Sequence, residues 1–172
     1  IPAYNEEGMV GQVVRGIRRH APDFDIVVVD DGSTDATFVE ASAEDVAVIR
    51  HPFNLGIGGA MQSGFKYAAA NEYDVAVQVD GDGQHKPTYL NDLLEALRTS
   101  GKADMVCGSR FREDPGYKVP IGRRIGNLIF SLILSVMVRR RITDPTSGFR
   151  MTNRRGIELF ARDYPHDYPE VE

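Results

Sequence analysis

The sequence predicts an α/β domain with a mainly parallel sheet covered by helices on both faces. Short β-branched runs alternate with amphipathic helical patterns, and a polar or glycine-rich segment follows each run. The chain has 172 residues, of which 42% are hydrophobic and 26% charged, enough for one packed core and few for two. We expect a single domain over residues 1–172. The sequence opens with IPAYNEE and stops at YPEVE, so this expectation allows for truncation at both ends.

The first three strands are predicted from short apolar runs. Residues 1–3 have the character of a strand end, and the runs IVVV at 26–29 and VAVI at 46–49 consist mostly of β-branched residues. Between the first two runs, apolar residues recur at i, i+3, i+4 and i+7 from Val10 to Ile17, which predicts a helix. After the third run, residues 61–70 form the next helical pattern.

The second half of the predicted sheet follows the same alternation. The run VAVQV at 75–79 predicts a fourth strand, leucines from Leu90 to Leu97 recur at helical spacing, and residues 105–107 predict a fifth strand. Cys107, the one cysteine, is expected to be a small buried strand residue and not a catalytic thiol. A single cysteine forms no internal disulfide, and we therefore expect a reducing, cytoplasmic location.

Charge is distributed unevenly along the chain. The formal net charge is −5, but residues 1–109 carry 8 Lys and Arg against 17 Asp and Glu, whereas residues 110–172 carry 12 against 8. An acidic half able to hold a cation therefore precedes a basic half able to hold an anion. The basic half lacks the aromatic and basic interleaving of nucleic-acid-binding modules, so we expect no nucleic acid partner.

Polar residues collect where each predicted strand ends, which is where α/β sheets bind their ligands. The segments are YNEE at 4–7, DDGSTD at 30–35, HPFNLGIGG at 51–59, DGDGQH at 80–85 and GSR at 108–110. Glycines from Gly56 to Gly59 permit close approach of the backbone to a ligand. Their spacing matches neither the P-loop nor the dinucleotide-binding fingerprint, which disfavours P-loop hydrolases and nicotinamide-dependent oxidoreductases.

Asp80 and Asp82 predict a divalent metal site. Two carboxylates at the end of a buried strand repel each other, and a cation offsets that repulsion. Mg²⁺ or Mn²⁺ suits the position, because these hard ions take one or two carboxylates together with substrate phosphates. The alternative is a solvated D-G-D-G turn that binds nothing.

Six ordered motifs resemble the family 2 glycosyltransferases of the GT-A fold, a Rossmann-like three-layer sandwich, over nearly the whole chain. The motifs are PAYNEE, VVVDDGSTD, NLGIGGAMQSGFKYA, VDGDGQH, GSRF and DPTSGFR. The branch that the chain most resembles contains dolichyl-phosphate mannosyltransferase and bacterial polyprenyl-phosphate glycosyltransferases. The resemblance implies an inverting, metal-dependent hexosyltransferase of the cell envelope. Its donor would be a nucleoside diphosphate sugar of the UDP-glucose or GDP-mannose type.

The resemblance places the nucleotide-sugar site in the first, second and fourth loops. Asp31 is expected to accept a hydrogen bond from the base, and Tyr4 to offer a stacking face. Asp80 is expected to meet the ribose or the metal, Asp82 to bind the metal as part of the DxD motif, and Gln84 to touch the diphosphate or sugar. The other nucleotide-sugar-binding positions are Pro2, Ala3, Glu6 and Gly56.

The expected acceptor is a polyprenyl phosphate. Arg110 and Arg150 lie within the family-like motifs and can hold a phosphate in bidentate fashion. Arg123 and Arg124 are explained equally well as a solvated basic surface. Asp144, in DPTSGFR, lies where related enzymes place a catalytic base: it takes a proton if the acceptor is a sugar hydroxyl, and positions groups or binds metal if the acceptor is an ionised lipid phosphate.

The apolar segment 127–138 is bracketed by arginines at 123–124 and 139–141. It is shorter than the roughly 20 residues that a membrane-spanning helix needs. Two interpretations stay open, a buried helix or a helix in the membrane interface. The second would give peripheral contact with the inner face of the membrane through residues 123–141.

Three other functions remain open. A transferase to a sugar hydroxyl in cell-envelope polysaccharide synthesis would use the same donor. A sugar nucleotidyltransferase would need a basic glycine-rich segment near the first strand, where this chain has the acidic YNEE. A non-catalytic nucleotide-sugar-binding module would keep the fold without the chemistry, yet the candidate charged residues Asp31, Asp80, Asp82, Asp144 and Arg150 are all present.

Overall fold

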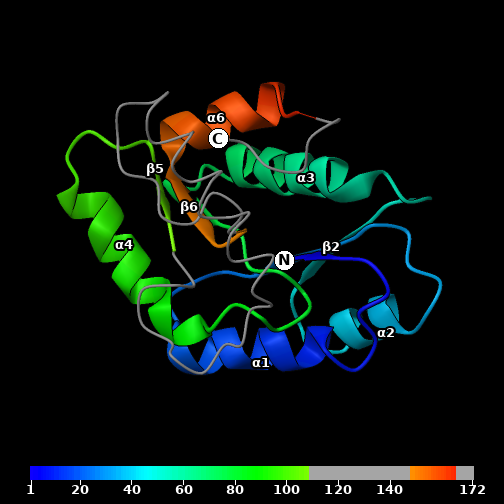
Figure 1. The fold of residues 1–172 in the computed structure, drawn as a ribbon. Helices are drawn as coiled ribbons and strands as arrows, with labels where there is room; N and C mark the ends of the chain where they lie inside the picture. Colours follow the sequence, from blue (N-terminus) through cyan, green and yellow to red (C-terminus); the bar gives the residue numbers. More distant parts are fainter. Residues whose placement is uncertain (109–147, 166–172) are drawn as a thin grey trace, which may run out of the picture.

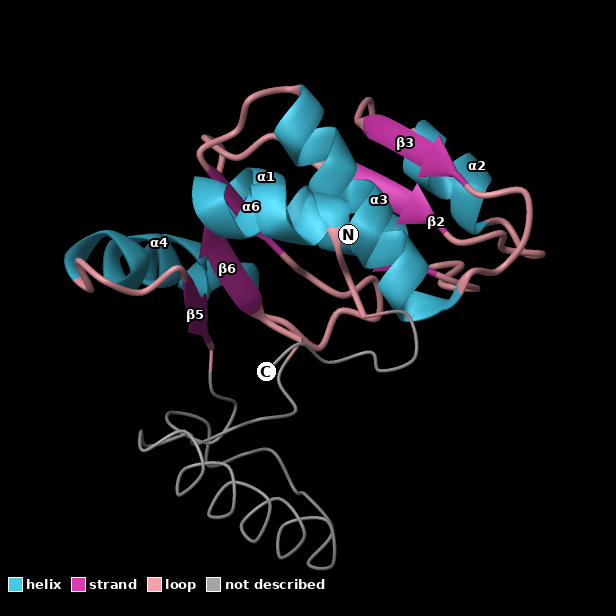
Figure 2. Cartoon of the chain, turned by 90° about the horizontal axis from the view of Figure 1, so that it is seen from above, coloured by secondary structure: helices cyan, strands magenta, loops and turns pink. Residues whose placement is uncertain are grey.

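The computed structural model describes residues 1–108 and 148–165, and in them strands lie between two layers of helices (Figure 1). This arrangement confirms the predicted α/β architecture. The strands form two three-stranded sheets, and the polar segments predicted to carry function follow the strands. Figure 2 shows the same chain from above, with β2 and β3 at one side and β5 and β6 at the other.

The first sheet is parallel, with strand order β1-β2-β3. Its strands are β1 (Pro2–Ala3), β2 (Val27–Asp30) and β3 (Ala47–Arg50). In the register, Pro2 lies opposite Val29, and Val29 opposite Ile49. The second and third strands begin and end one residue later than predicted, so Asp30 is the last residue of β2 and Asp31 the first residue beyond the sheet.

The second sheet contains a strand that the sequence did not predict. β4 (Val75–Val77) and β5 (Met105–Cys107) lie on either side of β6 (Arg150–Asn153), and β6 pairs antiparallel with both. The residues of β6, RMTN, show no apolar run, and their extended conformation is stabilised by the two neighbouring strands. Cys107 lies at the end of the edge strand β5 and is exposed, so the prediction that it is buried was wrong.

The helices cover the sheets as the apolar spacing predicts. Their bounds are α1 (Val10–His20), α2 (Thr37–Ser42), α3 (Gly56–Ala70), a 3₁₀ turn η1 (Pro87–Tyr89), α4 (Leu90–Thr99) and α6 (Arg154–Arg162). α3 and α6 lie side by side on one face, where the rings of Phe65 and Phe160 approach to 5.1 Å between centroids (Figure 1). α1, α2 and α4 lie on the other face, and α1 buries the predicted stripe from Val10 to Ile17.

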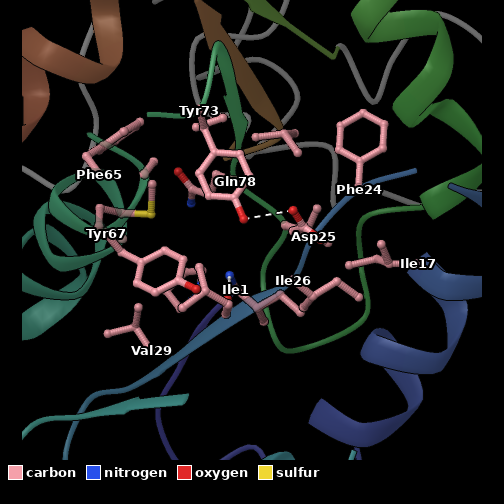
Figure 3. Close-up of a pocket in the computed structure, with 18 of the residues that line it drawn as sticks. Ile1, Ile17, Phe24, Asp25, Ile26, Val29, Phe65, Tyr67, Tyr73 and Gln78 are labelled. Atoms are coloured by element: carbon pink, nitrogen blue, oxygen red, sulfur yellow. Dashed lines mark hydrogen bonds between the residues drawn. The ribbon is translucent and has the colours of Figure 1, made fainter. Parts of the chain in front are cut away.

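An apolar cavity of about 120 Å³ lies between the two sheets and α3 (Figure 3). At its rim the hydroxyl of Tyr73 donates to Oδ2 of Asp25 at 2.8 Å, and this bond raises the pKa of Tyr73 to about 12. The walls are mostly aliphatic and aromatic, and the polar residues that follow the strands lie outside the cavity. The cavity is therefore not the candidate site.

No helix in the described parts of the chain has both the length and the apolar character needed to cross a bilayer. The predicted buried or interfacial helix at 127–138 lies outside the described residues, as do the arginines that bracket it.

Candidate functional site

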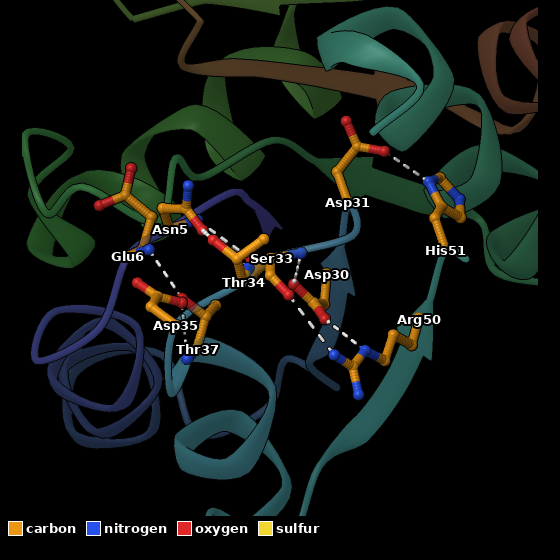
Figure 4. Close-up of polar contacts among 10 residues, drawn as sticks. All are labelled: Asn5, Glu6, Asp30, Asp31, Ser33, Thr34, Asp35, Thr37, Arg50 and His51. Atoms are coloured by element: carbon orange, nitrogen blue, oxygen red, sulfur yellow. Dashed lines mark hydrogen bonds and ion pairs between the residues drawn. The ribbon is translucent and has the colours of Figure 1, made fainter. Parts of the chain in front are cut away.

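The loop after β1 is held against the segment after β2 by four consecutive backbone amides, of which Figure 4 shows those of Asn5 and Glu6. Each N–H donates to a side chain of residues 33–40, and the pairs are Asn5 to Ser33 at 3.0 Å, Glu6 to Thr37 at 2.7 Å, Glu7 to Asp35 at 3.1 Å and Gly8 to Glu40 at 2.8 Å. The Asn5 side chain returns the contact by accepting from the N–H of Thr34 at 3.0 Å. The first two predicted loops therefore form one rigid unit.

Asp30 is used inside the fold. Its side chain is fully buried, and Oδ1 accepts from the N–H of Ser33 at 3.1 Å. Oδ2 lies 3.1 Å from Nε of Arg50, whose guanidinium lies over the ring of Phe38 at 4.5 Å. A buried carboxylate needs such partners. Among the described residues Oδ1 is hydrogen-bonded, whereas Oδ2 accepts no hydrogen bond and is offset only by the charge of Arg50.

Asp31 points the other way, as the second of two successive residues in an extended segment should. Oδ1 accepts from the N–H of Leu55 at 2.9 Å and lies 2.7 Å from Nδ1 of His51. The Nε2 atom of His51 lies 2.8 Å from Oγ of Ser63, on α3. Asp31 and His51 are both buried, and Figure 4 shows the second oxygen of Asp31 directed away from His51.

Sequence reasoning assigned Asp31 to the site but gave His51 and Ser63 no role. His51 directly follows β3, and that position at the carboxyl end of a strand is the signal that could have found it. Ser63 lies inside α3, and no sequence signal marks it.

Gly32 allows the turn that presents Asp31. Its φ is +72°, in the left-handed region, and a Cβ there would lie 2.6 Å from the carbonyl carbon of Phe53. A side chain at this position would therefore be strained by both its own backbone and its neighbour.

Asp80 is held from several directions at the end of the segment after β4. Oδ1 accepts from Nε2 of Gln78 at 2.8 Å, and the backbone N–H donates to Nδ1 of His85 at 3.1 Å. Oδ2 lies 3.6 Å from Nε2 of His85, and the His85 ring stacks on Phe149 with 5.0 Å between centroids. Gly148 approaches so closely that a Cβ there would lie 2.8 Å from Oδ2 of Asp80.

Asp82 lies beside Asp80 on a turn that rests against β1. Its Oδ1 accepts from the N–H of Gln84 at 2.9 Å, and Gln84 is exposed. The N–H of Gly81 donates to the carbonyl oxygen of Pro2 at 3.2 Å, which fixes the turn on the end of β1.

Glu6 faces this turn. A Cβ on Gly81 would lie 3.3 Å from Cγ of Glu6, so the two loops are in contact. Burial raises the pKa of the Glu6 carboxyl above its ordinary value, and the negative charges of Asp82, Asp35 and Asp80 raise it further. Negative charge therefore concentrates at the ends of β1 and β4, where a bound cation would be stabilised.

The residues present fit a divalent ion that arrives with a phosphate ligand. Within residues 1–108 and 148–165, no three His, Cys, Asp or Glu side chains are placed to hold a metal by themselves. Asp80 and Asp82 supply two carboxylates, which is the set that Mg²⁺ or Mn²⁺ takes when substrate phosphates and water complete the shell.

The remaining predicted positions divide into three groups. Pro2 and Ala3 are buried in β1, and Tyr4 beyond them is 46% exposed, free to meet a ligand. Gly56, with φ +81°, begins α3, and a Cβ there would have no neighbour within 4 Å. Arg110, Arg123, Arg124 and Asp144 lie outside the described residues.

Arg150 is buried at the start of β6, and its carbonyl oxygen accepts from the N–H of Gln78, two residues before Asp80, at 2.8 Å. Burial raises the pKa of the Tyr164 hydroxyl, while the positive charge of Arg150 lowers it and the negative charge of Asp80 raises it. Arg150 and Asp80 therefore both lie within electrostatic reach of Tyr164. The structure brings this predicted arginine to the same edge of the molecule as the predicted metal site.

Comparison with known proteins gives consistent matches. Residues 1–160 match the model of the family described as Glycosyl transferase family 2. The UDP-N-acetylglucosamine–dolichyl-phosphate N-acetylglucosaminyltransferase of Methanococcus voltae is 33% identical over 179 residues, covering 94% of this chain and 70% of that protein. The undecaprenyl-phosphate mannosyltransferase of Micrococcus luteus is 39% identical over 158 residues, covering 87% of this chain and 63% of that protein.

The fold also matches a solved enzyme. The glucosyl-3-phosphoglycerate synthase of Mycobacterium tuberculosis, in complex with Mn²⁺ and UDP-glucose, superposes with a TM-score of 0.68 and 25% sequence identity. The match covers 90% of this chain and 54% of that enzyme, so this chain spans about half of the solved structure.

Proposed function

The chain belongs to glycosyl transferase family 2 and has the GT-A fold, and from this premise we propose that it transfers a sugar from a nucleoside diphosphate sugar to a polyprenyl phosphate. The observation that carries the donor side is the convergence of Asp31, Glu6, Asp80 and Asp82 at the carboxyl ends of β1, β2 and β4. The acceptor is supported by the names of the two sequence relatives, a dolichyl-phosphate and an undecaprenyl-phosphate transferase.

The rigid unit formed by the first two loops is proposed to bind the nucleoside. Asp31 accepts a hydrogen bond from the base, and the exposed ring of Tyr4 stacks on it. Pro2 and Ala3 present backbone at the end of β1, and Gly56 lets the start of α3 approach the donor. UDP and GDP sugars both fit this description; one matched protein is named for UDP-N-acetylglucosamine, and another was crystallised with UDP-glucose.

Asp80 and Asp82 are proposed to hold Mg²⁺ or Mn²⁺ together with the diphosphate, and Gln84 to contact the diphosphate or sugar. When bound, the ion neutralises charge on the departing nucleoside diphosphate. The matched synthase was crystallised with Mn²⁺, which supports a divalent ion in the function proposed for this chain. The bond that Asp80 accepts from Gln78 and the bond that its N–H donates to His85 fix it before any ligand arrives.

The reaction is proposed to invert the anomeric centre. An oxygen of the acceptor phosphate attacks the anomeric carbon opposite the diphosphate, and a new C–O bond forms. The bond between that carbon and the diphosphate oxygen breaks, and its electron pair leaves with the nucleoside diphosphate. An ionised phosphate carries no proton to remove, so Asp144 then positions groups, while Arg110 and Arg150 hold the acceptor phosphate.

A second candidate is transfer to a hydroxyl of a small phosphorylated acid. It is favoured by the solved match, since glucosyl-3-phosphoglycerate synthase was also crystallised with phosphoglyceric acid. In that reaction the hydroxyl proton must be removed, and Asp144 is the candidate base.

The test is turnover by the purified chain with Mn²⁺, a UDP-sugar or a GDP-sugar, and one of three acceptor conditions: a short polyprenyl phosphate, phosphoglyceric acid, or none. Release of nucleoside diphosphate that requires the polyprenyl phosphate and stops with a chelator is the expected result. Asp82→Asn serves as the inactive variant, and Asp23→Asn, at an exposed position, is the matched control. Release that requires phosphoglyceric acid would favour the second candidate, and donor binding without release would point to a binding module.

A further inference from the structure

The hydrogen-bonded chain from Ser63 through His51 to Asp31 is more elaborate than a buried carboxylate requires. Asp31 already accepts from the N–H of Leu55. In addition, the buried imidazole of His51 contacts Asp31, and Ser63 on α3 contacts the other nitrogen of that imidazole. Such a line of bonds fixes the orientation of its last member.

The protons in this chain can be assigned from chemistry. An ionised carboxylate only accepts, so the Nδ1 atom of His51 carries the proton that faces Oδ1 of Asp31. In the neutral imidazole Nε2 is then the acceptor, and the Ser63 hydroxyl donates to it. Asp31 therefore selects the ring tautomer, and Ser63 holds the ring in place by donating to Nε2.

The two oxygens of Asp31 are left unequal. Oδ1 accepts from both His51 and Leu55, which uses its two lone pairs. Among the described residues no donor contacts Oδ2, and Figure 4 shows that oxygen turned away from His51. Asp31 therefore offers a ligand one oxygen rather than a bidentate pair.

Bases differ in the donors that they show to a carboxylate. Uracil has a single N3–H between two carbonyl groups, whereas guanine has a parallel pair, N1–H and N2–H, which needs both oxygens of a carboxylate. A guanine on Asp31 would bring one of its donors to an oxygen already saturated by the protein. Leaving a buried donor unpaired is costly.

We propose that His51 and Ser63 are positioning residues that reserve one oxygen of Asp31 for the base and thereby select uracil over guanine, an inference that rests on the proposed nucleotide-sugar function. It narrows the donor to uridine diphosphate sugars. His51 and Ser63 touch Asp31 and each other, and act on the base only through Asp31.

The test is calorimetric binding of UDP and GDP at one Mn²⁺ concentration, which keeps the metal and diphosphate contribution common to both. The wild-type chain is expected to bind UDP at least about tenfold more tightly than GDP. His51→Phe keeps a ring of similar size but removes the donor, freeing Oδ1 for a second bond, and the preference should fall below about threefold. His20→Phe, at an exposed position on α1, should leave the preference unchanged.

Ser63→Ala is the second variant and keeps the test decisive if His51→Phe does not fold. It leaves the His51 ring in the protein but removes the hydroxyl that donates to Nε2 and orients the ring, and the preference for UDP should fall about two- to threefold. A purely structural role would weaken both nucleotides equally and leave their ratio unchanged in both variants, which would overturn the inference.

The wild-type result separates this inference from the function on which it rests. Equal or tighter binding of GDP would overturn the inference while leaving a nucleotide-sugar transferase intact. Failure of both nucleotides to bind would overturn the proposed function itself, and the inference with it.

Discussion

The chain contains two pairs of neighbouring aspartates, and the fold uses them in opposite ways. Asp30 and Asp31 are adjacent at the end of β2, so their side chains diverge, one to the Arg50 ion pair inside the fold and one to the site. Asp80 and Asp82 are separated by one glycine, and both act on the same neighbour, Glu6. In the first pair, Asp30 stabilises the fold and Asp31 faces the proposed ligand. In the second pair, both residues add negative charge at the same place.

This difference indicates how a sequence distinguishes structural from functional carboxylates. Asp30 is fully buried and its charge is offset by Arg50, so it is not available to a ligand. Asp80 and Asp82 instead both raise the pKa of Glu6, so a cation bound beside them would be stabilised. We expect substitutions in the two pairs to separate stability from activity.

The largest effect is expected from Asp82→Asn. Loss of one metal-facing carboxylate should lower nucleoside diphosphate release about 10²–10³-fold, since charge on the leaving group is no longer offset. Because Asp82 is partly exposed and accepts only from Gln84 among the described residues, the free energy of unfolding should change little. Turnover with saturating donor and urea unfolding on the same sample measure both quantities. Equal turnover in variant and wild type would contradict the assignment of Asp82 to activity.

Asp30→Asn should show the reverse pattern. It removes the buried charge opposite Arg50, and the free energy of unfolding should fall by about 1–3 kcal/mol, less than for a fully buried ion pair because Arg50 is half exposed. Urea unfolding measures the loss, and donor affinity of the folded fraction should stay within twofold of wild type. A variant of full stability with weakened donor binding would assign Asp30 to the site instead.

Gly32→Ala tests the turn on which the first pair depends. The variant combines a left-handed backbone with a contact to the Phe53 backbone, and it should lose about 2 kcal/mol or more. Gly8→Ala is the matched control, because Gly8 also has positive φ, +81°, but nothing within 4 Å of its Cβ position, so it should lose only about 1 kcal/mol. Equal losses in the two variants would show that the close approach to Phe53 contributes nothing.

Glu6→Gln should give the smallest effect and a pH dependence of predictable sign. Because the pKa of Glu6 is raised in the folded state, its ionised form destabilises the fold above that pKa, and the penalty vanishes below the unfolded value. The variant should therefore raise Tm by about 1–2 °C at pH 7 and leave it unchanged near pH 4. Thermal unfolding across this range, with the exposed Glu95→Gln as control, provides the measurement. A variant that stabilises equally at both pH values would contradict the electrostatic explanation.

Much of the fold was predictable because its determinants are local. The helical spacing of apolar residues in α1 and the β-branched runs of β2 and β3 can each be recognised within a few residues. β6 was missed because RMTN becomes a strand only between β4 and β5, two segments far from it in the sequence. The exposure of Cys107 likewise depends on β5 lying at the edge of its sheet, which no local pattern reveals.

The site was predictable to a similar depth. Asp31 follows β2 directly, Asp80 and Asp82 lie in the segment after β4, and the sheet geometry brings such positions together. The division of labour between Asp30 and Asp31 was not predictable, because it depends on Arg50 in the neighbouring strand. The role of Ser63 could not be predicted from the sequence, since its contact with His51 arises only when α3 packs against the end of β3.

Of the two aspartate pairs, Asp80 and Asp82 are the one proposed to bind the cation. Electron paramagnetic resonance of Mn²⁺ in the presence of UDP tests this proposal directly, using wild type, Asp82→Asn and Asp30→Asn. Wild type and folded Asp30→Asn should show a UDP-dependent, protein-bound Mn²⁺ signal, and Asp82→Asn should show only the signal of Mn²⁺ with UDP in solution. A protein-bound signal of equal strength in Asp82→Asn would contradict the account.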